Sequence, residues 1–205
     1  MLRSVAGFPG AYLAGKSKKS VRLKGYNQRF PRTRLKTVQG PGRTMEMTVL
    51  QAGEIAPDFD LPVLMGGVKK RFRLAERRGK QNLVLAFYPL NWEPVSTRQM
   101  VAYQVEREKL VARETEVVGI SVDSIMNTTA WEREIGPLDY LLCSDFWPHG
   151  EVSRKYGVLR EAEPFAGASE RAVFVVDKAG RIEFSKVYPL NQAPDLQETL
   201  NALRR

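Results

Sequence analysis

The chain has 205 residues, a hydrophobic fraction of 43%, one cysteine and one histidine. This length gives room for one ordinary domain with a buried core, and no apolar stretch reaches the length of about 18 residues that a membrane span needs. One cysteine excludes an internal disulfide and one histidine excludes a histidine-cluster metal site, so we expect neither a metal nor a cofactor.

The net charge of +9 is concentrated at the N-terminus. Residues 1–46 contain eleven Lys/Arg and one acid, Glu46, which gives this segment a charge of +10 and leaves −1 for residues 47–205. The segment has no helical or strand period, so we predict a disordered basic extension before a domain over 47–205. Three interpretations of the extension stay open: translation starts at Met47, the segment is an arm in weak contact with nucleic acid, or it is a targeting peptide.

Strands and helices alternate along the first half of the domain. A hairpin is predicted over 56–73, with its turn at Met65-Gly66-Gly67. The apolar run over 82–88 predicts a strand that is buried on both faces. A helix is predicted over 94–113. Its apolar stripe contains Val95, Val101, Val105 and Leu110.

The second half continues this alternation and ends in a hairpin. Further strands are predicted over 115–122, 140–143, 172–176 and 181–187. Further helices are predicted over 123–136, 150–156 and 194–204, and a surface loop over 160–170. This order of elements predicts a single α/β domain in which helices flank a mixed central sheet.

The stretch after the buried strand has the features of a reactive site. The strand stops at Pro89, and Pro94 fits the first turn of the next helix because its fixed φ is already helical. Ser96 then lies in that first turn, beside backbone N–H groups without partners and at the positive end of the helix dipole. Such a position suits an anion or a reactive thiolate.

This stretch resembles a known active-site loop. Phe87-Tyr88-Pro89, followed by Glu93 and Ser96, is similar to the pattern Pro-x-x-x-Thr-x-x-Cys of the peroxiredoxins, the alkyl hydroperoxide reductase/thiol-specific antioxidant family. Other similar segments are 56–62, 142–146, 156–158 and 171–177, so the resemblance covers residues 49–203. It implies a thioredoxin-like fold, and residues 146–150 resemble the one-cysteine bacterial subgroup.

The resemblance assigns positions to four residues. Ser96 replaces the peroxidatic cysteine, Glu93 replaces a hydrogen-bonding threonine, Pro89 keeps the place of a shielding proline, and Arg171 corresponds to the active-site arginine. In such a site the helix N-terminus and the arginine stabilise a thiolate. An alcohol stays protonated there and forms no sulfenic acid, so we expect no thiol peroxidase turnover from Ser96.

Glu93 is the second departure from the family pattern, because its carboxylate would disfavour a thiolate at position 96. We therefore hypothesise that Glu93 pairs with Arg171 and fills the former peroxide pocket. The alternative is that Glu93 points to solvent and only caps the helix. Cys143 is expected to be a small buried hydrophobe, and His149 a loop residue.

Three functional hypotheses follow. The chain is a peroxiredoxin-family protein whose peroxidase chemistry is lost or altered, a peroxidase that uses Cys143 or a partner thiol, or a module that senses anions or peroxides. The resemblance also implies a homodimer with a hydroperoxide or small anion as its ligand. We expect a cytoplasmic protein without membrane contact.

Overall fold

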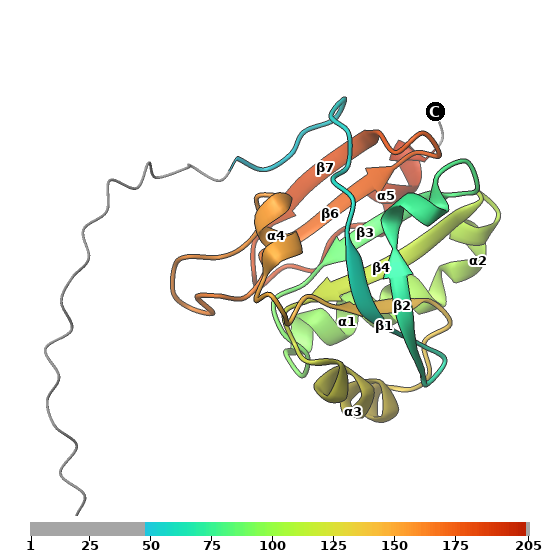
Figure 1. Ribbon diagram of the computed structural model, residues 1–205. Helices are drawn as coiled ribbons and strands as arrows, with labels where there is room; N and C mark the ends of the chain where they lie inside the picture. Colours follow the sequence, from blue (N-terminus) through green and yellow to red (C-terminus); the bar gives the residue numbers. More distant parts are fainter. Residues whose placement is uncertain (1–47, 204–205) are drawn as a thin grey trace, which may run out of the picture. The chain divides into compact units, whose positions relative to one another are not determined.

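A seven-stranded mixed sheet forms the centre of the computed structural model, which describes residues 48–203 (Figure 1). The strands are β1 (Asp60–Met65), β2 (Val68–Arg73), β3 (Asn82–Phe87), β4 (Thr115–Ser121), β5 (Leu141–Ser144), β6 (Arg171–Val176) and β7 (Ile182–Tyr188). The helices are η1 (Leu74–Arg77), α1 (Pro94–Val105), α2 (Arg107–Val111), α3 (Ile125–Ile135), α4 (Glu151–Lys155) and α5 (Leu196–Ala202). The disorder predicted for 1–46 concerns residues outside the described range.

The order of strands across the sheet is β2-β1-β5-β4-β3-β6-β7. The three central strands β5, β4 and β3 run parallel, whereas the outer pairs are antiparallel, so the predicted mixed sheet is confirmed. The predicted hairpin is formed by β1 and β2. It turns at Gly66 and Gly67, whose φ angles of +54° and +74° lie in the region that glycine adopts readily.

Strand β3 is buried on both faces, as its apolar run predicts. Leu83, Leu85 and Phe87 point into one hydrophobic core. The alternate residues Val84 and Ala86 point into the other. The two cores cover opposite faces of the sheet, because successive side chains of a strand alternate between its faces. A strand with no wet face needs a continuous apolar sequence.

Helices cover both faces of the sheet (Figure 1). On one face, α1, α2, α3 and α5 contribute Met100, Leu110, Trp131 and Leu200 to the core. On the other face, α4 contributes Val152, and the segment before β1 contributes Phe59. The parallel strands β3 and β4 both finish at the same end of the sheet. There the chain turns from β3 into α1 and from β4 into α3.

The helix predicted over 94–113 is in fact two helices, and its predicted apolar stripe is confirmed for Val95 and Leu110 but wrong for two other residues. The chain leaves helical geometry at Glu106, with φ −96° and ψ 12°. Val101 and Val105 of the stripe are 37% and 74% exposed. Helix α1 instead buries a set that includes two polar residues: Val95, Ser96, Gln99, Met100 and Tyr103. The helix is rotated so that Ser96 and Gln99 face the start of β6.

The remaining predicted helices are confirmed, with shifted ends. Helix α3 begins after Ser124, whose Oγ accepts a hydrogen bond from the N–H of Asn127 at 3.3 Å. Helix α5 begins at Leu196, because the carboxylate of Asp195 caps it by accepting from the N–H of Gln197. Within residues 48–203, no helix combines the length and apolarity required to cross a membrane.

Candidate active site

The sheet topology brings the sequence-predicted site residues together. Strands β3 and β6 are antiparallel neighbours, and Phe87 near the end of β3 pairs with Ala172 near the start of β6. The first turn of α1 therefore lies beside Arg171, the first residue of β6. Pro89 is buried directly after β3, between the sheet and this turn.

Glu93 is the residue that starts α1. Its carboxylate accepts hydrogen bonds from the backbone N–H of Val95 at 2.8 Å and of Ser96 at 2.6 Å. The hydroxyl of Ser96 donates to the same carboxylate, with 2.8 Å between Oγ and Oε2. Ser96 is fully buried, so its hydroxyl has no contact with solvent. The donors that would attract an external anion at this helix start are thus used by Glu93.

The guanidinium of Arg171 is also fully buried, and protein acceptors surround it. Its Nη2 lies 2.8 Å from Oε2 of Glu93 and 2.9 Å from the carbonyl oxygen of Leu190. Its Nη1 lies 2.8 Å from Oε1 of Gln99 and 3.4 Å from Oγ of Ser96. Its Nε donates to the Leu190 carbonyl at 3.3 Å. These five contacts match the five N–H groups of a guanidinium.

The hypothesis of an ion pair between Glu93 and Arg171 is confirmed. The alternative was that Glu93 points to solvent and only caps the helix. Its first part is wrong, because the Glu93 side chain is only 17% exposed. Glu93 does cap α1, as the second part states. One carboxylate therefore performs both tasks.

Glu93 and Arg171 each stabilise the charged form of the other. Burial raises the pKa of Glu93, but hydrogen bonds from Val95 and Ser96, together with Arg171, outweigh burial and hold the pKa below its ordinary value. Burial lowers the pKa of Arg171, and Glu93 opposes that change. Glu93 is consequently ionised at neutral pH, and the site contains a fixed pair of opposite charges.

A second polar network, which the sequence did not predict, fixes the loop between β3 and α1. The hydroxyl of Tyr88 donates to Oδ1 of Asn91 at 3.0 Å, and the backbone N–H of Asn91 donates to Oδ2 of Asp123 at 2.8 Å. Asp123 stands just before Ser124, the residue that caps α3, and its carboxylate holds this loop. Trp92 follows with φ +65°, an uncommon value outside glycine, and its Nε1 donates to Asn127.

One polar atom beside Arg171 has no hydrogen-bond partner. Among the described residues, Nε2 of the buried Gln99 is unpaired, and so are the hydroxyls of Tyr103 and Thr199. Gln99 thus uses its oxygen for Arg171 and leaves its nitrogen inside the core. Gln99 was not among the site residues predicted from the sequence.

Cys143 and His149 lie away from this arrangement. Cys143 is fully buried in β5, where burial raises the pKa of its thiol, with a further contribution from Glu116. This confirms the expectation of a small buried hydrophobe. His149 is exposed in the loop before α4, and its Nε2 lies 2.7 Å from the carbonyl oxygen of Gly167.

Comparison with known proteins identifies relatives along most of the described domain. The family model described as AhpC/TSA family matches residues 52–185. A Synechocystis protein described as "Putative peroxiredoxin sll0755" is 37% identical over 162 residues, which are 76% of this chain and 78% of that protein. The chloroplastic 2-Cys peroxiredoxin BAS1 of Hordeum vulgare is 32% identical over 158 residues, which are 74% of this chain and 73% of that protein.

Solved structures give the same answer for the fold. The reduced 2-Cys peroxiredoxin of Plasmodium vivax matches with a TM-score of 0.69 and 25% identity, over 75% of this chain and 80% of that chain. AhpC of Enterococcus faecalis matches with a TM-score of 0.68 and 26% identity, over 75% and 90%. The predicted thioredoxin-like α/β fold is therefore confirmed.

Proposed function

Because this chain belongs to the AhpC/TSA family of peroxiredoxins, we propose that it keeps the scaffold of a thiol peroxidase but does not reduce hydroperoxides at Ser96. Peroxide reduction in such a site needs a thiolate that attacks oxygen and becomes a sulfenic acid. A serine hydroxyl supplies neither the ionised nucleophile nor the oxidisable atom. The scaffold then serves binding, assembly or regulation.

The single observation that carries this proposal is the hydrogen-bonded triad of Glu93, Ser96 and Arg171. Oε2 of Glu93 accepts from both the Ser96 hydroxyl and Nη2 of Arg171. The carboxylate accepts the hydrogen bonds of the groups that would otherwise stabilise a thiolate or polarise a peroxide. The Glu93 side chain thus takes the place that a substrate would need.

The two alternatives gain less support from the same geometry. An anion or peroxide sensor needs free donors, and each N–H group of Arg171 already has a protein acceptor. An external anion must displace Glu93 to bind. A peroxidase that uses Cys143 needs an accessible thiolate, and this thiol is buried with a raised pKa.

The test compares peroxide consumption by wild type, Ser96→Cys, and Ser96→Cys combined with Glu93→Thr, with a dithiol as reductant. We expect no turnover above buffer for wild type and at most weak turnover for Ser96→Cys, because Glu93 still opposes a thiolate. The double variant should be at least about tenfold faster than Ser96→Cys, equivalent to about 1.4 kcal/mol of activation barrier.

A parallel set of the same variants with Cys143→Ser separates turnover at position 96 from turnover by the second thiol. Equal rates for the single and double variants would show that Glu93 does not obstruct the site. Rapid turnover by wild type that persists after Ser96→Ala would overturn the proposal.

We also propose that the protein is a homodimer, as the peroxiredoxin resemblance implies, and that it is cytoplasmic. A hydroperoxide or small anion remains the ligand expected for a site restored by the double variant. The proposed contact of the basic extension with nucleic acid concerns residues 1–46, outside the described range.

A further inference from the structure

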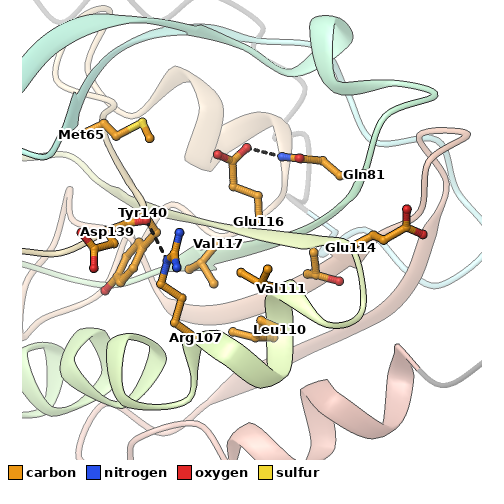
Figure 2. A pocket seen from close by; sticks show the side chains of 11 residues that line it. Met65, Gln81, Arg107, Leu110, Val111, Glu114, Glu116, Val117, Asp139 and Tyr140 are labelled. Atoms are coloured by element: carbon orange, nitrogen blue, oxygen red, sulfur yellow. Dashed lines mark hydrogen bonds between the residues drawn. The ribbon is translucent and has the colours of Figure 1, made fainter.

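A cavity of about 180 Å³ lies at the far end of the sheet from Ser96. It opens between α2, the start of β4 and the start of β5 (Figure 2), whereas Ser96 lies in the first turn of α1, beyond the end of β3. The cavity shares no residue with the site described above. It is comparable in size to an apolar cavity of about 150 Å³ that binds benzene.

Apolar side chains form the floor of this cavity. Leu110 of α2, Val117 of β4 and Tyr140 before β5 are each at least 97% buried. Met65 at the end of β1 lines the cavity from the side and is 41% exposed. The Tyr140 hydroxyl donates to the carbonyl oxygen of Met100 at 2.7 Å, so its ring is held in place. The floor is rigid, and it can contact the body of a small apolar molecule.

Arg107 adds a positively charged guanidinium group, and a hydrogen bond fixes its orientation. Its Nε donates to the carbonyl oxygen of Asp139 at 3.0 Å. Asp139 is itself held by Gln104, through one bond in each direction at 2.9 Å. In the part of the chain that the structure describes, neither Nη group of Arg107 has a hydrogen-bond acceptor or a carboxylate within ion-pair distance. These two groups are the free donors of the cavity.

Glu116 lies on the other side of the cavity, and Val117 lies between it and Arg107 (Figure 2). Its carboxylate accepts from Nε2 of Gln81 and lies 3.6 Å from Nε of Arg77, so its own partners come from outside α2. Burial raises the pKa of Glu116, against the effect of Arg77, Gln81 and Arg107. A second carboxylate at the far end of a ligand held by Arg107 would face Glu116 and be repelled by it.

We propose that this cavity binds a small apolar monocarboxylate. The carboxylate accepts two parallel hydrogen bonds from the Nη groups of Arg107, a geometry that guanidinium groups favour. The apolar body packs on Leu110, Val117 and Tyr140. Three carboxylates also line the cavity, and each has a partner of its own: Glu114 pairs with Lys178, Glu116 with Arg77 and Gln81, and Asp139 with Gln104. The proposal does not depend on the chemistry at Ser96.

The test uses benzoate as the probe and the full chain as the protein. Titration is followed by amide ¹H–¹⁵N chemical shifts. We expect saturable shifts that cluster at Leu110, Val117 and Tyr140. Arg107→Gln should weaken benzoate binding by about tenfold or more, because the charge-assisted bonds are lost. Arg154→Gln, which changes an exposed arginine on α4, is the matched control and should leave the affinity unchanged.

Benzamide and terephthalate complete the experiment. Benzamide lacks the charge and terephthalate carries a second one at the opposite end of the ring, so both should bind at least about tenfold more weakly than benzoate. Benzamide binding as tightly as benzoate would overturn the proposal, and so would benzoate shifts that cluster around Arg171. An unchanged affinity in Arg107→Gln, with the wild-type spectrum otherwise preserved, would overturn it as well.

Discussion

Glu93 decides the character of the candidate site, because four hydrogen-bond donors depend on its one carboxylate. It accepts hydrogen bonds from two backbone N–H groups of α1, from the Ser96 hydroxyl and from Arg171. Truncating one member of a buried ion pair leaves the other charge without compensation. The residue is therefore expected to matter for folding as well as for the proposed absence of peroxidase chemistry.

The stability contributed by Glu93 should depend on pH. Its folded-state pKa lies below the ordinary value of 4.5, so the ionised form is favoured by folding. The contribution is present above pH 4.5 and is lost as the pH falls through the lower folded-state pKa. Glu93→Gln should lower the free energy of unfolding by about 3 kcal/mol at pH 7, and by progressively less below pH 4.5.

Urea unfolding of wild type and Glu93→Gln between pH 3 and pH 8 measures this difference. Glu161→Gln, a change of an exposed glutamate in a surface loop, is the control and should show little effect at any pH. A difference between wild type and Glu93→Gln that stays constant over the whole range would show that the folded-state pKa is not depressed.

The main contact of the site, the ion pair of Glu93 and Arg171, could be predicted from the sequence, but the groups around it could not. The pairing of Glu93 with Arg171 was predictable because the family resemblance places both positions around one pocket, and opposite charges in a buried pocket pair. The roles of Leu190 and Asn91 were not predictable. Leu190 acts through its backbone carbonyl, which any residue supplies, and Asn91 acts through a network that closes only in the folded sheet.

At the level of elements, α1 shows why an apolar period can mislead. Its valines at 101 and 105 follow a helical period, but they lie on the outer side. The orientation of the helix is set by Ser96 and Gln99, which are buried toward Arg171. A helix that buries polar groups at a site has no clear apolar face, so its orientation cannot be derived from hydrophobicity.

A second prediction at the level of elements concerns the accessibility of Cys143 in strand β5. Cys143 lies between β1 and β4, where it pairs with Val63 on one side and with Ile120 on the other. A reagent reaches the thiol only when the sheet opens. We expect labelling by a thiol reagent at pH 7.5 to be about a thousandfold or more slower in buffer than in urea, because opened molecules are that rare.

Labelling is followed by absorbance or by mass, and Cys143→Ser, which should show no signal in urea, verifies the assignment. A rate in buffer that approaches the rate in urea would mean that the thiol is accessible. Such a result would bring back the hypothesis of a peroxidase that uses Cys143.

For the whole molecule, the alternation of strands and helices was sufficient to predict the architecture. The central strands are apolar on both faces, and the closing hairpin of β6 and β7 follows a turn that the sequence marks at Asp177-Lys178-Ala179-Gly180. The order of strands across the sheet was not derivable from this pattern. It depends on long-range pairings, such as β1 with β5, for which the sequence has no local signal.

The two edges of the sheet differ in a way that bears on assembly. Edge strand β2 contains Lys69, Lys70, Arg71 and Arg73, and charged side chains on an edge discourage pairing with another chain. The other edge, β7, carries fewer charges and includes the partly exposed Val187. Of the two edges, β7 is the one better suited to contact a second copy.

Sedimentation over a concentration series tests the homodimer. We expect a species of twice the 23.2 kDa of one chain at micromolar concentration. Val187→Lys should shift the equilibrium toward the single chain, because a charge would be buried at the contact. Val105→Lys, the same substitution at an exposed position on the outer side of α1, is the control. A single chain at all concentrations would contradict the expected homodimer.

The shared carboxylate of Glu93 also determines how a reactive thiol could be restored at this site. A thiol at position 96 alone would stand beside a negative charge, and loss of the glutamate alone would strand a buried cation. Each first step toward a working reaction centre is thus penalised until the other has occurred. Restoring a reactive thiol at this site therefore requires both substitutions together.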